Sequence, residues 1–90
     1  MNTVILNSTE FSSSDELHAV LKYKLQLPEY YGANLDALWD CLTAWIELPI
    51  RIEWVGYDNS KQKIGEYAEM LLKTFQEAEN EIEGFTFIQK

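Results

Sequence analysis

Three short apolar runs, set far apart in the sequence, constrain the fold of this 90-residue chain more than any other feature. Residues 3–6 (TVIL), 50–55 (IRIEWV) and 85–88 (FTFI) are rich in β-branched and aromatic residues, which is typical of buried strands. The segments between them are too long for hairpins and carry helical periodicity, so we expect crossover connections and parallel strands. The sequence therefore predicts an α/β domain in which helices pack on a three-stranded parallel sheet.

The first helix is predicted from its start signal and from apolar residues that recur at helical intervals. Ser13 and Glu16 have the spacing of a capping box, and Leu residues follow with a helical period. The helix should end near residues 25–27, because Pro28 cannot continue it. His18 lies in this helix without other metal-binding residues at suitable spacing, so we expect a surface or boundary histidine rather than a ligand.

The second half of the chain predicts a loop or short helical turn over residues 56–65 and a long helix over residues 66–81. Gly84 is expected to stop this helix ahead of the last strand. Glu77 lies off the apolar side, and one interpretation is a solvated residue paired with Lys73. The side expected to be buried carries Tyr67, Met70, Leu71, Thr74, Phe75, Ala78 and Ile82.

The segment 28–45 (PEYYGANLDALWDCLTAW) combines a turn with a helix. Pro28 ends the incoming helix, Gly32 permits a positive φ in the turn, and Asn34 is a good N-cap for the next helix. On a helical wheel one arc is apolar and should face the core. This arc consists of Leu35, Leu38, Leu42 and Ile46, with Trp39 and Trp45 at its edges.

Two carboxylates one helical turn apart, Asp36 and Asp40, lie on the opposite face of this helix, toward solvent. The sequence has no Lys or Arg between Lys24 and Arg51, so no neighbouring cation compensates their charge. One interpretation is a solvated face beside tyrosines that only pack. The other is a binding surface, because exposed aromatic residues beside uncompensated acids suit a cationic partner.

The same segment resembles the central part of the barstar family, intracellular inhibitors of the bacterial ribonuclease barnase. The resemblance continues through ELP and IEW to SKQ near Ser60 and to FQEA ahead of the last strand, while LHAVLK resembles the family's first helix. It covers nearly the whole chain without an obvious gap. It implies a single domain over residues 1–90, with a three-stranded parallel sheet and about four helices.

The resemblance implies an inhibitor that blocks the active site of a barnase-type ribonuclease with an acidic helix and adjoining loop, which mimic the RNA phosphate. Carried over by position, Asp40 would occupy the phosphate site and Asp36 would make the second charged contact. The other contacts would come from Tyr30, Tyr31, Gly32, Asn34, Trp39, Thr43, Trp45 and Glu77. The partner would be a basic, extracellular-type ribonuclease, and the free inhibitor would be monomeric. The alternative is an acidic interaction or immunity module that binds a different basic nuclease toxin, or a non-nuclease protein, through the same face.

Catalytic, metal and cofactor functions are not expected. Carboxylates that neighbour one another on a helix do not face each other across a bond, and no phosphate-cradling Gly loop accompanies them. Cys41 should pack beside the core, and a lone cysteine forms no intrachain disulfide, which fits a reducing cytoplasm. We find no signal peptide and no membrane-spanning run. The net charge of −8 argues against a nucleic-acid partner, because a nucleic-acid binder needs Lys and Arg to displace counterions from phosphates.

Overall fold

The computed structural model describes residues 2–90 and confirms the α/β class, with a three-stranded parallel sheet and four α-helices. The three predicted strands and the predicted helix over residues 66–81 are all present. In chain order the elements are β1 (Asn2–Asn7), the 3₁₀ turn η1 (Ser8–Glu10), α1 (Ser14–Lys24), α2 (Leu35–Ala44), β2 (Ile50–Val55), α3 (Tyr57–Ile64), α4 (Glu66–Glu81) and β3 (Phe85–Gln89).

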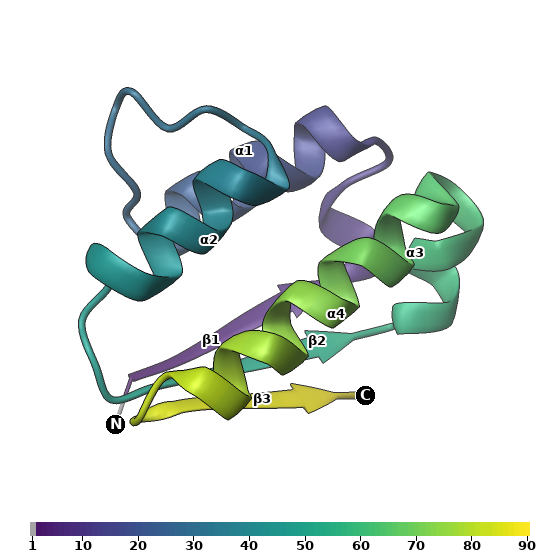
Figure 1. Ribbon diagram of the computed structural model, residues 1–90. Coiled ribbons are helices and arrows are strands. Elements are labelled where there is room, and N and C mark those ends of the chain that lie inside the picture. The colour runs from purple at the N-terminus through teal and green to yellow at the C-terminus, as the bar shows by residue number, and fades with distance from the viewer. Residues whose placement is uncertain (1) are drawn as a thin grey trace.

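The sheet has β2 at its centre, paired with β1 on one side and with β3 on the other. Val4, Ile52 and Phe87 are neighbours across the three strands, and all three are buried. Helices α1, α2 and α4 lie on one side of the sheet, and α3 lies at the end toward which the strand arrows point (Figure 1). The paired residues Ile5 and Glu53 lie at the alternate positions, on the uncovered face. The core therefore lies between one face of the sheet and a single layer of helices.

Trp54 is fully buried and organises the part of this core next to α3. Its Nε1–H donates to Ser60 Oγ at 3.0 Å, and the Ser60 hydroxyl donates to the carbonyl oxygen of Gly56 at 3.2 Å. The indole ring contacts Tyr57 and Phe75 edge-on, with ring centroids 5.1 and 6.2 Å away. The Trp54–Ser60 hydrogen bond thus satisfies the indole N–H inside an apolar cluster.

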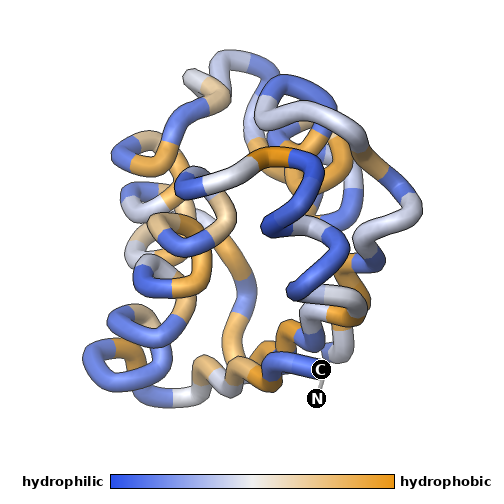
Figure 2. Tube along the Cα trace, turned by 90° about the vertical axis from the view of Figure 1, so that its right-hand side faces the viewer, coloured by the Kyte–Doolittle hydropathy of each residue, from blue (hydrophilic) through white to orange (hydrophobic). Residues whose placement is uncertain are grey.

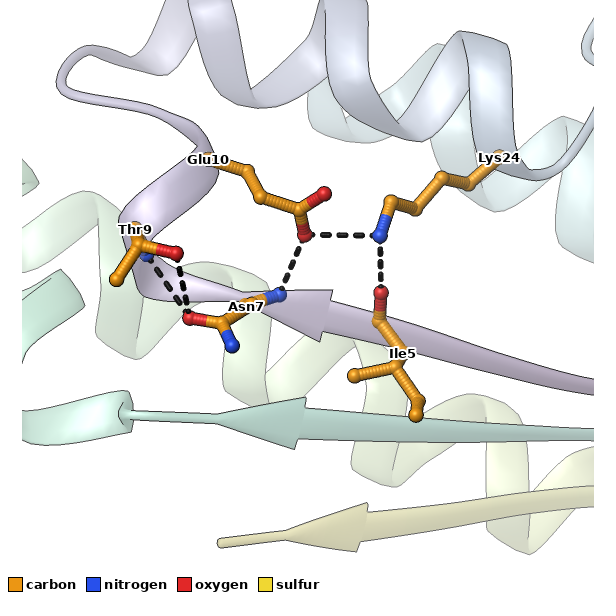
Figure 3. A network of polar contacts seen from close by, with 5 residues as sticks. All are labelled: Ile5, Asn7, Thr9, Glu10 and Lys24. Carbon is orange, nitrogen blue, oxygen red and sulfur yellow. Dashed lines mark hydrogen bonds and ion pairs between the residues drawn. The ribbon is translucent and has the colours of Figure 1, made fainter.

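A network of polar contacts joins the end of α1 to the free edge of β1 (Figure 3). Lys24 Nζ donates to the Ile5 carbonyl oxygen at 2.6 Å and to Glu10 Oε1 at 2.8 Å, and the same carboxylate oxygen accepts from the Asn7 backbone N–H at 2.9 Å. The hydrogen bond from Lys24 is the main reason why the pKa of Glu10 is lowered. The network satisfies edge groups of β1 that no neighbouring strand can reach.

Two predictions about the second half of the chain need correction. Residues 57–64, predicted as a loop or short helical turn, form the eight-residue helix α3, because Tyr57 and Ser60 are buried against the core and anchor it. Met70, expected inside, is 53% exposed. The buried stripe of α4 is instead Ala68, Leu71, Phe75 and Ala78. Along the helices hydrophilic and hydrophobic residues alternate, as expected for helices with one buried face (Figure 2).

Replacing Ser60 with Ala should lower the free energy of unfolding by about 1–3 kcal/mol, because the buried Trp54 N–H loses its hydrogen-bond acceptor. The measurement is urea denaturation followed by tryptophan fluorescence. Ser12→Ala, which truncates an exposed serine, is the matched control and should change the unfolding midpoint little. Equal midpoints for the two variants would contradict this role of Ser60.

Candidate protein-binding site

Helix α2 begins as the sequence predicts. Asn34 is the N-cap, and its side-chain oxygen accepts a hydrogen bond from the Ala37 N–H at 2.7 Å. Leu38, Cys41 and Leu42 face the core and are buried, which confirms the expected core side and the packing role of Cys41. The helix ends at Ala44, so Trp45 is its C-cap and Ile46 lies just beyond it. The opposite face of α2 is therefore free for other uses.

Asp36 and Asp40 are both exposed on this free face, as predicted. Within residues 2–90 neither carboxylate has an ion-pair partner within 4.0 Å. Thr43 is exposed one turn later, and its hydroxyl donates back to the carbonyl oxygens of Trp39 and Asp40, at 2.9 and 3.1 Å. Trp39 is partly buried against the core, as expected for the edge of the apolar arc. This face of α2 thus presents two uncompensated negative charges on a packed helix.

The connection between α1 and α2, residues 25–34, arches over the side of the helices away from the sheet (Figure 1). It is tied down at several points. The Trp45 indole N–H donates to the Gln26 carbonyl oxygen at 3.0 Å, and Lys22 Nζ donates to the Glu29 carbonyl oxygen at 3.2 Å. The Asn34 side-chain amide donates to the Gly32 carbonyl oxygen at 3.2 Å. The loop is therefore held in one conformation by its surroundings.

Two aromatic residues of the site are strongly exposed. Tyr30 is 81% exposed and Trp45 is 49% exposed. Their rings meet edge to face, with centroids 6.4 Å apart and an interplanar angle of 82°. Exposed large aromatic side chains are common where proteins bind one another. Tyr30 lies in the loop before α2 and Trp45 is the C-cap of α2, so both aromatic residues flank the helix that carries the acids.

Gly32, expected to permit a positive φ in the turn, does not adopt one. The positive φ values near this turn belong to Gln26 and Ala33, both at 53°. The lack of room for a side chain, rather than φ, accounts for a glycine at position 32, because a Cβ there would come within 3.3 Å of the Ala37 Cβ. Gly32 itself is exposed, so its backbone is open to close approach from outside.

Glu77 is exposed on α4, which packs beside α2. The ion pair with Lys73, expected as one interpretation, does not form among the described residues. No hydrogen bond between side chains of residues 2–90 joins Glu77 to the loop or to α2, so its place in the site remains a prediction.

The structure places two residues behind the loop that the sequence pattern did not connect with it. His18 is 2% exposed, so its assignment as a surface or boundary residue is wrong. Its Nδ1 lies 2.6 Å from the Tyr31 hydroxyl and its Nε2 lies 2.6 Å from the Tyr67 hydroxyl. Burial lowers the pKa of His18 and raises the pKa values of both tyrosines. Tyr67 follows His18 by 49 residues, and no local pattern in a single sequence reports such a contact.

Metal and membrane features are not found in the described part of the chain. Among residues 2–90, no group of three His, Cys, Asp or Glu side chains is placed to hold a metal ion. None of the helices described has the length and apolar content needed to cross a membrane. Burial, followed by the nearby Asp40, raises the pKa of Cys41, which favours the thiol over the thiolate.

Comparison with known proteins gives the family. The family model described as Barstar (barnase inhibitor) matches residues 1–89. The chain belongs to the barstar family. Within this family it is 43% identical over 82 residues to a protein of Bacillus subtilis (strain 168) named "Putative ribonuclease inhibitor YrdF", covering 91% of this chain and 90% of YrdF. The resemblance found in the sequence is thereby confirmed, whereas the roles of individual site residues remain predictions.

Stability of this barstar-family chain should depend on pH through His18. Because the folded state lowers the pKa of His18, the unfolded chain binds a proton more readily once the pH falls below about 6.5. The free energy of unfolding should therefore decrease between about pH 7 and pH 5, by at most about 1.4 kcal/mol per pH unit. Urea titrations at each pH measure this change.

His18→Asn, which cannot titrate, is the control and should give a flatter profile in this pH window. The ion-paired Glu10 and Glu53 have lowered pKa values, so the stability that they contribute is lost only below about pH 4.5. A wild-type profile as flat as that of His18→Asn would show that His18 does not control stability here.

Proposed function

We propose that this chain is an intracellular inhibitor of a barnase-type ribonuclease and that it covers the nuclease active site with α2 and residues 25–34. Family membership and the name of the YrdF relative support a ribonuclease-inhibitor role. The inhibitor acts by binding alone and is not an enzyme. It works as a monomer in the cytoplasm, where it meets a basic, secreted-type nuclease before export.

The observation that carries this proposal is the pair of exposed carboxylates of Asp36 and Asp40 on one face of α2, neither of which has an ion-pair partner in the described part of the chain. An enzyme that cleaves RNA must present cations to the scissile phosphate. A carboxylate can take the phosphate position and accept charge-assisted hydrogen bonds, above all from Arg. Asp40, one turn into the helix from Asp36, is the residue that we assign to the phosphate site.

A rigid support makes these carboxylates effective. The Asn34 cap and the buried Leu38 and Leu42 hold α2 in place, so little conformational entropy is lost when a partner binds. Tyr30 and Trp45 supply apolar contact area beside the charges. In this proposal the remaining contacts come from Tyr31, Gly32, Asn34, Trp39, Thr43 and Glu77.

The net charge of −8 also acts before the two proteins touch, through long-range electrostatic attraction. A strongly acidic domain attracts a basic protein before contact and raises the association rate. The same charge repels RNA, so the inhibitor competes with the substrate without binding it.

Asp40→Ala should weaken binding to a barnase-type ribonuclease by at least about 2 kcal/mol, or roughly thirtyfold, because the cationic site of the nuclease loses the carboxylate that binds it. Complexes of the barstar family are themselves a standard example of such charged contacts. The measurement is RNA cleavage while the inhibitor is titrated into the nuclease. Asp58→Asn is the matched control, since Asp58 is an exposed acid on α3, away from α2 (Figure 1).

Near-stoichiometric inhibition by the wild type and by Asp58→Asn, but not by Asp40→Ala, would support both the function and the assignment. Equal inhibition by all three proteins would overturn the role of Asp40. Untouched cleavage would overturn the barnase-type partner and would favour a different basic protein bound through the same face.

Association should also slow as salt is added. Raising the ionic strength from about 0.01 M to about 1 M shortens the Debye length from about 30 Å to about 3 Å, which screens attraction before contact. We expect the association rate constant to fall at least about tenfold, with a smaller change in the dissociation rate. Stopped-flow mixing measures both rates. An association rate independent of salt would remove long-range attraction from the mechanism.

A further inference from the structure

His18 connects three separate parts of the molecule through its two ring nitrogens. It belongs to α1, Tyr31 belongs to the loop 25–34 and Tyr67 belongs to α4. Each tyrosine hydroxyl lies 2.6 Å from one nitrogen, and the ring centroids are 5.7 Å from that of His18 in both cases. With only 2% of His18 exposed, both nitrogens depend on these hydroxyls for their hydrogen bonds.

The single ring proton of neutral His18 couples the hydrogen bonds of the two tyrosines. A neutral imidazole carries one N–H, so it donates one hydrogen bond and accepts one. Burial keeps His18 neutral at pH values above its lowered pKa. One tyrosine must therefore accept from His18 while the other donates to it. The direction of the hydrogen bond at Tyr67 sets the direction at Tyr31.

The surrounding charge favours one of the two arrangements. Asp15 lies three residues before His18 in the first turn of α1, so the two side chains are neighbours on that helix, and its negative charge acts on both His18 and Tyr67. Of the two arrangements, this charge favours the one that leaves the Tyr67 O–H free to turn away from the His18 ring. Tyr67 then accepts from His18 Nε2–H, and Tyr31 donates its own O–H to the unprotonated Nδ1.

We propose that Tyr67 is a positioning residue for partner binding. By fixing the Nε2–H tautomer of His18, it holds the Tyr31 hydroxyl inward and keeps the loop 25–34 in its binding conformation. Tyr67 lies on α4, outside the predicted contact set, and acts only through His18 and Tyr31. The binding part of this inference rests on the proposed function, whereas the tautomer can be tested on the free protein.

A pre-set Tyr31 would help binding because the loop would not have to be ordered at the moment of contact. Tyr31 is only partly exposed, while the neighbouring Tyr30 is almost fully exposed and points away from the core. Anchoring the Tyr31 ring also fixes the adjacent backbone that carries Tyr30. Pre-organisation of this kind lowers the entropic cost of association.

The first test is the tautomer of His18 in the free protein, read from its two imidazole nitrogen chemical shifts by NMR at a pH where the ring is neutral. We expect a protonated Nε2 and an unprotonated Nδ1 in the wild type. In Tyr67→Phe the Nε2–H loses its acceptor, so the population should move toward the Nδ1–H form. A wild-type Nδ1–H form, or an unchanged tautomer in Tyr67→Phe, would overturn the proposed hydrogen-bond direction.

The second test is a double-mutant cycle of Tyr67→Phe and Tyr31→Phe, with binding to a barnase-type ribonuclease as the readout. Tyr67→Phe alone should weaken binding by about two- to tenfold, the usual range for one neutral hydrogen bond. In the Tyr31→Phe background it should cause no further loss, because the link to the loop is already broken. Tyr57→Phe removes a tyrosine hydroxyl on α3 that is not part of the His18 network, and it should leave binding unchanged.

The outcomes separate positioning from a purely structural role. A structural loss would weaken binding equally with and without the Tyr31 hydroxyl, which would overturn the inference. Unaltered binding in Tyr67→Phe would overturn it as well. If the wild type itself fails to bind the nuclease, the proposed function and the binding part of the inference fall together, and the NMR result alone decides the hydrogen-bond direction.

Discussion

Burial of one helical layer against one face of a three-stranded sheet is the constraint on which the rest of this structure depends. In a 90-residue chain a single core must supply nearly all of the stability. The inner faces of α2 and α4 are used for that core, through residues such as Leu38, Leu42 and Phe75. Their outer faces carry no packing duty, so α2 can present acids to solvent at little cost to the stability of the domain.

The site shows how a small domain fixes a loop without regular structure. Residues 25–34 are held by hydrogen bonds from Lys22, Trp45 and Asn34, and from behind by the contact between Tyr31 and His18. Each of these bonds is modest, but together they leave the loop little freedom. Such order favours the binding of another protein, because any disorder in the surface has to be lost on binding.

The acids that form ion pairs within the fold are different from the acids exposed on α2. The ion pairs of the described residues join Glu10, Glu53 and Glu69 to nearby cations, away from the acidic face of α2. Among these residues no cation pairs with Asp36 or Asp40, although a helix prefers opposite charges one turn apart. The fold does not require this arrangement, and in the proposed function it is the surface that meets a cationic partner.

The sequence by itself determined the class of fold, the three strands, the limits of the long helix over residues 66–81, the Asn34 cap and the exposure of Asp36 and Asp40. These features follow from local patterns, namely apolar periodicity, capping chemistry and the absence of cations. Tertiary structure alone decided the helical state of residues 57–64, the exposure of Met70 and the burial of His18 between Tyr31 and Tyr67. Those outcomes depend on which surfaces meet after the chain has folded, and contacts between residues so far apart leave no periodic signal in one sequence.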